Sequence, residues 1–497
     1  MPVNRGRPAP LTRRAAHAAW WSAIEIVSRT GVQFIVTLVL ARLLLPRDFG
    51  LVALLMIFTG VGAILVDSGF GTALIQRQRT TPDDETTVFA FSLAMAALLW
   101  VLLILAAPFA AGFFRAPQLS PLLRVASLVL LFGGLGAVPD ALLTTRLNFR
   151  ARTVAQLVAS TISGAVAIGL AVEGFGVWSL VWQLLIASVL RTGCLWVFCK
   201  WYPRGRVSAT SFRSLGSFGS FMLFSSMLNA IYLQAQPLLI GRLFDTRSLG
   251  YYTLAQNSQQ APLSLVGGVL TRVGLPVFSA LADQTARLLE ALRPILRLSM
   301  FVFVPCMVGL AVLARPLVLL IYGTRWLPAA PILSVLAIAG TLWPLHVLNL
   351  EAIKAQGRSD LFFRLAVIKV TFATILVVLA SPWGPIGIAW ATVAAGAINA
   401  GINTYYSWKL LDYGPLMQAA EQLPTFALSA LAALVGWCIL HWMRIGPIAV
   451  LPAIAGAVIA YLGTARIFKV QALTDLTSFL HVLRADKAIH PESDAPA

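Results

Sequence analysis

WWSAIEIVSRTGVQFIVTLVLARLLL, residues 20–45, can cross a bilayer as a helix, because about 20 apolar residues span the hydrocarbon core. Two charged residues, Glu25 and Arg29, lie four positions apart within it. A charge at that depth costs about 2.5–3.5 kcal/mol on insertion scales, so such side chains face a bundle interior or a water-filled cavity. Gln33 continues the same helical face. The stretch therefore predicts a membrane helix that lines a polar path.

The composition of the whole chain is that of a polytopic membrane protein. Of 497 residues, 59% are hydrophobic and only 11% are charged, whereas soluble domains carry about 25% charged residues. The formal net charge of +18 indicates basic cytoplasmic loops, and no nucleic-acid binding is expected. The 4 cysteines and 5 histidines have no metal-ligand spacing, so no metal site is predicted.

Apolar stretches of membrane-spanning length recur along the chain and predict an all-α protein with about fourteen transmembrane helices. If the N-terminus is cytoplasmic, Lys and Arg concentrate in the cytoplasmic loops, as the positive-inside rule requires. This asymmetry predicts an even number of spans and two cytoplasmic termini. The predicted spans are 20–45, 49–75, 87–111, 121–144, 153–173, 176–199, 215–241, 250–280, 298–321, 328–352, 361–380, 384–409, 423–443 and 446–467.

One cytoplasmic segment, DQTARLLEALRPILR at 283–297, alternates leucines with charges at helical spacing. This pattern predicts an amphipathic helix lying on the membrane surface. The alternative is a solvated extension of the ninth span.

Two loop segments match in a register of 200 residues, ARLLLPRDFG at 41–50 and GRLFDTRSLG at 241–250. The identical pairs are Arg42 and Arg242, Leu43 and Leu243, Arg47 and Arg247, and Gly50 and Gly250. A weaker echo relates Gly176 and Trp182 to Gly384 and Trp390. Six spans followed by six more predict a parallel duplication, with two pseudo-symmetric lobes and the substrate between them.

The duplication divides the chain into predicted parts. These are a cytoplasmic tail at 1–19, an N-lobe of six spans at 20–202, a cytoplasmic linker at 203–214, a C-lobe of six spans at 215–411, two further spans within 412–469 and a cytoplasmic tail at 470–497.

Polar residues concentrate on the first, seventh and eighth spans, and the charges within spans are mostly basic. A guanidinium binds phosphate in a bidentate manner, so an anionic substrate such as a phosphorylated lipid carrier is expected rather than an organic cation. The predicted substrate-binding residues are Arg29, Arg272, Lys369, Gln33, Asn229, Gln236, Asn257 and Gln260. The predicted coupling or gating residues are Glu25, Asp67 and Asp140.

Each of these residues also has a purely structural interpretation. Polar side chains cross-link membrane helices, at about 0.6 kcal/mol each. Glu25 and Arg29 would form an ion pair within one helix, and Asp140 would pair with Arg146. Arg191 and Arg124 also lie within spans and rank behind the other basic residues.

The chain resembles the polysaccharide-transporter branch of the multidrug/oligosaccharidyl-lipid/polysaccharide (MOP) flippase superfamily, which includes Wzx-type and colanic-acid-type exporters. The resemblance covers about residues 15–470. The segments that carry it are ARLLLPRDFGLVAL at 41–54, DSGFGTALIQRQ at 67–78, YYTLAQN at 251–257, TRVGLPVFSAL at 271–281 and YGTRWLPAAPIL at 322–333.

The resemblance implies two six-helix lobes in a V shape, with two extra helices. It implies that the protein moves undecaprenyl-diphosphate-linked oligosaccharides across the bacterial inner membrane for exopolysaccharide or lipopolysaccharide synthesis. Basic cavity residues bind the diphosphate in related flippases, and Arg29 and Arg272 are the positions that fit this role here. The polymerase and glycosyltransferases of the same pathway are candidate partners.

No enzymatic activity and no cofactor are expected, and a proton gradient, a sodium gradient or the membrane potential are the candidate energy sources. Two other functions stay open. A cation-coupled multidrug or small-molecule exporter of the same superfamily would have acidic cavity residues. A membrane polysaccharide polymerase or acyltransferase would show a large periplasmic loop or a paired acid–base motif, and neither is visible in the sequence.

Overall fold

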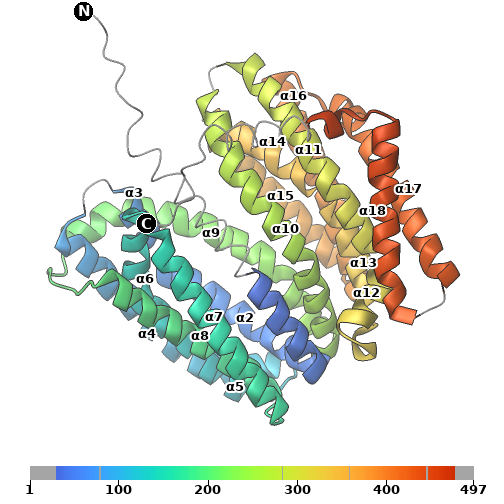
Figure 1. Ribbon diagram of the computed structural model, residues 1–497. Coiled ribbons are helices and arrows are strands. Elements are labelled where there is room, and N and C mark those ends of the chain that lie inside the picture. The colour runs from blue at the N-terminus through green and yellow to red at the C-terminus, as the bar shows by residue number, and fades with distance from the viewer. Residues whose placement is uncertain (1–29, 78–79, 282–283, 357–358, 444–445, 476–497) are drawn as a thin grey trace, which may run out of the picture. The chain divides into compact units, whose positions relative to one another are not determined.

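The computed structural model describes residues 30–77, 80–281, 284–356, 359–443 and 446–475, and this part of the chain is helical without strands (Figure 1). The chain forms two compact units. The first extends to Leu254 and includes Ser381–Pro385, and the second contains Ala255–Ala380 and the chain from Ile386 onward.

The first unit contains the helix Thr30–Leu43, α2 (Pro46–Asp67), α3 (Phe70–Gln76), α4 (Pro82–Phe113), α5 (Leu119–Ala126), α6 (Leu128–Thr145), α7 (Phe149–Val172), α8 (Val177–Cys199), α9 (Ala209–Leu243), the start of α10 (Thr246–Ala280) and the turn η2 (Ser381–Trp383). The second contains the rest of α10, α11 (Thr285–Val312), α12 (Ala314–Ile321), η1 (Thr324–Trp326), α13 (Ala329–Gly340), α14 (Trp343–Ala355), α15 (Ser359–Ala380), α16 (Gly384–Leu411), α17 (Pro415–Met443), η3 (Gly446–Ala449) and α18 (Val450–Ile467).

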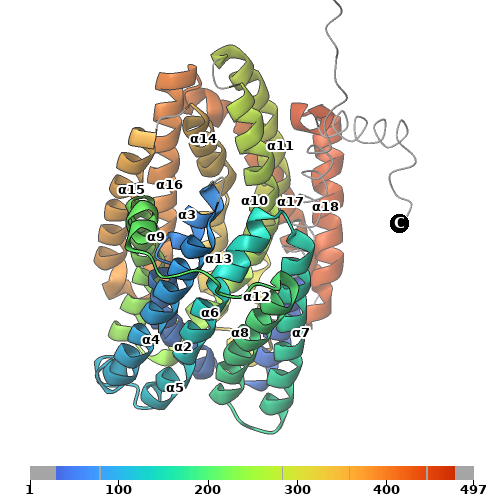
Figure 2. The same ribbon diagram turned by 90° about the vertical axis from the view of Figure 1, so that its left-hand side faces the viewer.

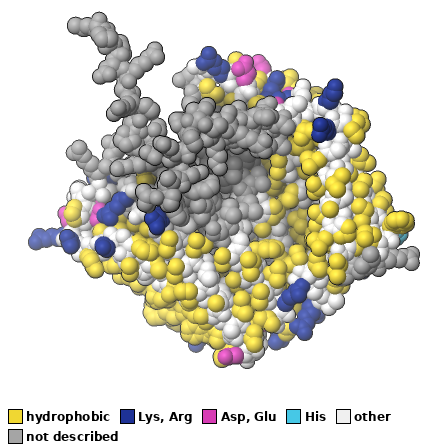
Figure 3. Space-filling view, in the orientation of Figure 1, with side chains coloured by type: hydrophobic (Ala, Val, Ile, Leu, Met, Phe, Trp, Pro, Cys, Tyr) yellow, Lys and Arg dark blue, Asp and Glu magenta, His cyan; other side chains and the backbone are white. Residues whose placement is uncertain are grey.

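Membrane-spanning helices dominate the described residues. Ten helical stretches there are long and apolar enough to cross a bilayer, and one of them, Arg364–Leu411, contains most of α15 together with α16. The described part of each predicted span coincides with a helix or with a pair of consecutive helices. Among the side chains coloured by type in Figure 3, hydrophobic ones predominate, with Lys and Arg in a few separate groups. The prediction of an all-α polytopic membrane protein is confirmed.

Residues 285–297 belong to a long helix, so the predicted surface helix is wrong. α11 runs without a break from Thr285 into the membrane span. Leu288, Leu292 and Leu296 are fully buried in a core cluster of the second unit, with Phe278, Leu348 and Tyr413. The apolar face of this segment therefore packs against protein rather than lipid, and the extension of the ninth span is the correct alternative.

The polar segment after α8 is fastened to the first turn of α4. Thr81 and Asp84 form a capping box, which satisfies N–H groups at the start of this helix. The backbone N–H groups of Gly205, Arg206 and Ser208 then donate to Thr86, Asp83 and Thr87 at 3.0, 2.8 and 3.0 Å. A Cβ at position 205 would overlap the backbone of Pro82, so glycine is required for this approach.

In the second unit, α17 and α18 lie side by side (Figures 1 and 2). Beside them, a buried polar network joins α14, α16 and α17. Asn349 donates to Gln418 at 2.9 Å, and Ser407 donates to Asn349 at 2.5 Å. All three residues are at most 1% exposed, so these hydrogen bonds fix the register of the three helices.

Candidate functional site

The two matching loop segments have the same backbone course. The helix Thr30–Leu43 and α9 both end at the matching leucines, and α2 and α10 begin at Pro46 and Thr246, again 200 residues apart. An extended residue lies in each break, Leu45 at φ −91° and Phe244 at φ −118°, at positions that differ by one in the register of 200. The repeat found in the sequence therefore has a structural counterpart.

The two helix starts touch each other through their glycines. A Cβ on Gly50 would overlap the carbonyl oxygen of Thr246, and a Cβ on Gly250 would overlap the carbonyl oxygen of Pro46. The two contacts are equivalent in the register of 200, because Gly50 corresponds to Gly250 and Pro46 corresponds to Thr246. Such reciprocity is what a two-fold rotation produces, so the matching segments meet on a pseudo-two-fold axis within the first unit.

Aspartates cap both helix starts, but from different positions. The Leu45 N–H donates to Asp48 on α2 at 3.0 Å, whereas the Ser248 N–H on α10 donates to Asp245 at 2.7 Å. A side-chain cap of this kind is worth about 1 kcal/mol. Both starts are therefore held as regular helix up to the point where they cross.

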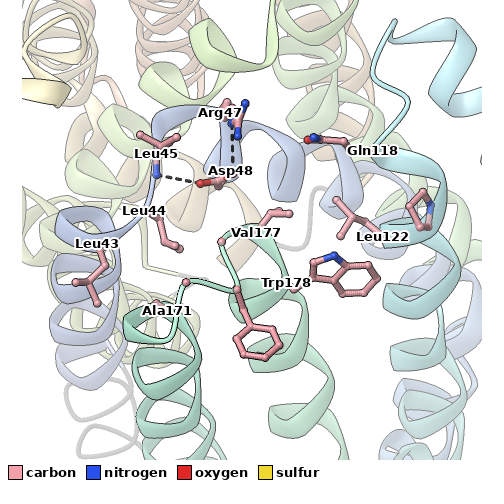
Figure 4. Close-up of a pocket in the computed structure, with 14 residues that line it drawn as sticks. Leu43, Leu44, Leu45, Arg47, Asp48, Gln118, Leu122, Ala171, Val177 and Trp178 are labelled. Atoms are coloured by element: carbon pink, nitrogen blue, oxygen red, sulfur yellow. Dashed lines mark hydrogen bonds and ion pairs between the residues drawn. The ribbon is translucent and has the colours of Figure 1, made fainter.

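A cavity of about 420 Å³ lies beside the start of α2, among α5, α8 and the turn between α7 and α8 (Figure 4). Arg47 and Asp48 lie on one side of it, and the ring of Trp178 lies on the other. Asp48 is only 7% exposed because it caps α2, while Arg47 is mostly exposed and lies 3.9 Å from this carboxylate. The cavity is adjacent to the glycine crossing and shares the segment 43–48 with it.

Three charged side chains from three helices meet at the opposite end of the first unit. Asp140 on α6 accepts from Arg152 on α7, with Nε to Oδ1 at 2.8 Å and Nη2 to Oδ2 at 3.4 Å. Arg191 on α8 lies 3.2 Å from the same Oδ2. Arg146 instead donates to the carbonyl oxygen of Cys199 at 3.4 Å, so the predicted Asp140–Arg146 pair is wrong.

Protein does not fully enclose this cluster. Its side chains are partly exposed, at 27% for Asp140, 24% for Arg152 and 38% for Arg191. Charges within membrane helices that are not enclosed by protein point to a function.

Arg191 lies on the side of α8 away from its most exposed face. Val189 and Gly193 are exposed and lie four residues apart, on one face of the helix. Arg191 is midway between them in sequence, so it is turned by about 200° from each. The guanidinium therefore does not share the face that an exposed valine and glycine present to the surroundings.

Asp67 lies near the cluster, at the end of α2. The backbone N–H groups of Gly69 and Gly71 donate to its carboxylate, which also feels the negative charge of Asp140. Gly69 in the turn after α2 has φ +71°, which favours glycine, and a Cβ on Gly71 would lie 2.5 Å from the Asp67 carboxylate. The turn explains why DSGFG stands at this position in the sequence.

Lys369 on α15, in the second unit, has neutral partners. Its ammonium donates to the side-chain oxygen of Asn403 on α16. The Asn403 amide nitrogen lies 2.6 Å from His346 Nδ1 and donates to the His346 carbonyl oxygen at 2.9 Å. Lys369 is 7% exposed and Asn403 is fully buried. The three side chains join α14, α15 and α16 around one buried cation.

The other predicted binding residues have different surroundings. Gln33 is exposed on the helix Thr30–Leu43, and Gln236 is buried and accepts from Tyr252 at 2.6 Å. Asn257 and Gln260 are exposed on α10 in the second unit. Their neighbour Gln259 is buried instead and donates to the carbonyl oxygen of Leu336 at 2.7 Å.

Four predicted residues lie outside the description. Glu25 and Arg29 precede the described residues, and the side chains of Asn229 and Arg272 on α9 and α10 are not described. The binding and coupling roles assigned from the sequence stay predictions.

Arg152 was not among the candidates from the sequence, and Arg191 ranked low. Arg152 directly precedes the predicted span 153–173, where a basic residue is ordinarily explained by the positive-inside rule. The available signal was Asp140 itself, because a carboxylate within a membrane span needs a cationic partner, and α7 and α8 follow directly in the chain.

Comparison with known proteins places the chain in a family. A family model described as polysaccharide biosynthesis protein matches residues 39–331. The succinoglycan biosynthesis transport protein ExoT of Rhizobium meliloti is 28% identical, over 88% of this chain and 89% of the relative. The teichuronic acid biosynthesis protein TuaB of Bacillus subtilis is also 28% identical, over 71% of this chain and 74% of the relative.

Solved structures of transporters share the fold. A lipid II flippase MurJ structure, in an inward closed conformation, aligns with a TM-score of 0.73 at 19% identity, over 91% of this chain and 98% of that chain. An inward-facing multidrug resistance MATE family transporter of the MOP superfamily aligns with a TM-score of 0.58 at 16% identity, over 78% of this chain and 98% of that chain. The chain belongs to the polysaccharide biosynthesis protein family.

Proposed function

We propose that this protein is a flippase that moves undecaprenyl-diphosphate-linked oligosaccharide units from the cytoplasmic to the periplasmic leaflet of a bacterial inner membrane, for exopolysaccharide or lipopolysaccharide synthesis. The observation that carries the proposal is the Asp140–Arg152–Arg191 cluster, which holds two guanidiniums together among membrane helices. Two guanidiniums bring about ten N–H donors, far more than one carboxylate can accept. The chemistry suits a diphosphate, which offers several anionic oxygens.

The relatives support the saccharide part of the proposal. ExoT is named as a transport protein of succinoglycan biosynthesis, and TuaB is named for teichuronic acid biosynthesis. MurJ is named as a flippase of lipid II, which supports a lipid-linked substrate.

The proposed mechanism makes and breaks no covalent bond. The headgroup enters a polar path from the cytoplasmic side while the polyprenyl tail stays in the lipid. Arg191 and Arg152 exchange part of their contact with Asp140 for the diphosphate, with Arg29 and Arg272 as further cations along the path. Rearrangement of the two halves of the repeat then exposes the headgroup to the periplasm, as in other transporters built from repeats.

The direct test is a strain that lacks the gene but still makes the lipid-linked saccharide. Its polysaccharide export should stop, and the lipid-linked saccharide should resist oxidation by periodate added outside spheroplasts. The wild-type gene should restore both export and oxidation. Normal export without the gene, or lost resistance to cationic drugs as the sole defect, would contradict the proposal and favour a small-molecule exporter.

A further inference from the structure

We propose that the cavity beside the start of α2 is a saccharide-binding site, which holds a sugar of the oligosaccharide on the side of the membrane where it is released. The inference rests on the proposed function for the identity of the saccharide, whereas the cavity and its chemistry are properties of this chain. The cavity volume of about 420 Å³ falls within the range of about 300–1,000 Å³ that small-ligand sites have.

The cavity lies at one end of the first unit, where three connections between helices come together. Its lining comes from the segments around the starts of α2, α5 and α8, within 43–48, 118–122 and 171–178. These segments connect the first predicted span to the second, the third to the fourth and the fifth to the sixth, so all three belong to the same side of the membrane. The distribution of Lys and Arg predicts that this side is the periplasm.

One side of the cavity is aromatic and comes from the turn between α7 and α8. Phe175 is 50% exposed in this turn, and the ring of Trp178 lies across the cavity from Asp48 (Figure 4). Gly174 and Gly176, at φ +87° and +56°, flank Phe175 and adopt a backbone conformation that favours glycine. The electron-rich face of an aromatic ring attracts the C–H groups on the face of a sugar ring, so this turn offers a stacking surface for a saccharide.

The polar groups around the cavity include both donors and acceptors. Arg47 only donates, the Gln118 amide donates and accepts, and Asp48 caps α2 through Oδ2, which leaves Oδ1 to accept from a ligand. The indole N–H of Trp178 adds a donor, because it has no hydrogen-bond partner among the residues that the structure describes. Each hydroxyl of a sugar donates and accepts, so this mixture beside an aromatic ring suits a saccharide.

The charge balance of the cavity favours a neutral saccharide over an anionic headgroup. Arg47 and Asp48 are the only charged residues among the described residues that line it, and Arg47 Nε lies 3.9 Å from Asp48 Oδ1. A phosphate would meet one cation that a carboxylate already balances, and this carboxylate would repel it. The Asp140 cluster has the opposite balance, with two guanidiniums for one carboxylate, and it suits the diphosphate.

The test measures binding of the free saccharide to the full-length protein in nanodiscs. The probe is the oligosaccharide unit that mild acid releases from the lipid-linked saccharide of the strain that carries the gene, so it has neither diphosphate nor lipid. Saturation-transfer NMR titrations should detect binding to wild-type protein, and Trp178→Ala should raise the dissociation constant at least tenfold. Trp178→Phe keeps an aromatic ring but loses the N–H donor, so it should raise the dissociation constant about threefold.

Trp182→Ala is the matched control. Trp182 lies about one turn further along α8, is 40% exposed and is not among the residues that line the cavity, so its loss should leave the dissociation constant within twofold of wild type. Gln118→Ala covers the case in which Trp178→Ala does not fold, because Gln118 is exposed and has no side-chain hydrogen bond among the described residues. This variant should raise the dissociation constant at least threefold.

Several outcomes overturn the site. Absence of saccharide binding to wild-type protein would do so, and so would binding that the Trp178 and Gln118 variants leave unchanged or that Trp182→Ala weakens equally. Glycerol 1-phosphate is titrated in parallel, and binding of this compound alone would make the cavity a site for a phospholipid headgroup instead. The proposed function fails separately, if the strain without the gene exports normally. Absent binding beside a clear export defect in that strain refutes only the saccharide site.

Discussion

The two units hold charge within the membrane in different ways. In the first, two guanidiniums share one carboxylate, and all three side chains are partly exposed. In the second, the ammonium of Lys369 is buried against the neutral side chain of Asn403, which in turn contacts His346. The first arrangement leaves the N–H donors of two guanidiniums partly exposed. In the second, the ammonium is buried and hydrogen-bonded within the protein. The difference predicts a ligand site in the first unit and a structural role for the charge in the second.

The largest effect is expected from Arg191→Ala. Removing one partner of a hydrogen-bonded charge pair at a binding site costs about 2–5 kcal/mol, so export should fall about 100-fold at unchanged protein level. Export of the polysaccharide, normalised to protein in the membrane, is the measurement. Arg124→Ala, an exposed arginine on α5, is the control and should export normally.

Arg191→Lys distinguishes a simple charge role of this residue from bidentate binding. A lysine keeps the charge but loses the planar fork, so partial export would indicate a simple charge role, and no export would indicate bidentate binding. Normal export by Arg191→Ala would remove the cluster from the substrate path.

A smaller effect is expected from Asp140→Asn. The change removes the negative charge between Arg152 and Arg191, so the guanidiniums repel each other and lose their fixed positions. Export should fall about tenfold, and stability should fall by about 1 kcal/mol, as for a partly exposed ion pair. Thermal unfolding in detergent measures the second quantity. A loss of export as large as that of Arg191→Ala would mean that Asp140 contributes as much to transport as the arginine.

In the second unit, Lys369→Met should leave export within twofold of normal. A buried charge replaced by an apolar side chain of similar length is often neutral or stabilising, so unfolding should shift by at most about 1 kcal/mol. Asn403→Ala should instead destabilise by about 3 kcal/mol, because it leaves the buried ammonium without its acceptor. A fall in export by Lys369→Met that matches Arg191→Ala would place Lys369 in the substrate path, as its sequence position predicts.

A change that affects stability alone is expected at Tyr413, between α16 and α17. Burial, together with the hydrogen bond it donates to Glu421 at 2.6 Å, raises the pKa of its hydroxyl above the ordinary value of about 10. The folded state thus keeps this proton to higher pH than the unfolded state, so the stabilisation is complete below about pH 10 and is lost above it. Tyr413→Phe should lower stability by about 1–2 kcal/mol below pH 10, and the difference from wild type should shrink at higher pH. A constant difference across that range would contradict this assignment.

The sequence predicted the helices because their signal is local. Apolar length marks each span, and the register of 200 between the segments 41–50 and 241–250 corresponds to two helix breaks at matching positions. The partners of Asp140 could not be read in the same way, since they depend on how α6, α7 and α8 pack. For the same reason, the leucines of 283–297 predicted an apolar helix face but not which surface packs against it. In the structure this face packs against protein.

The central claim, that this chain carries a lipid-linked diphosphate saccharide across a bilayer, is tested most directly in proteoliposomes. Purified protein is reconstituted with a fluorescent undecaprenyl-diphosphate saccharide, and the fraction reachable by an impermeant reducing agent is followed over time. Wild-type protein, supplied with a proton or sodium gradient or a membrane potential, should expose the inner-leaflet pool within minutes, and Arg191→Ala should not. Equal exposure in protein-free liposomes, or none with wild-type protein under any of these gradients, would contradict the account.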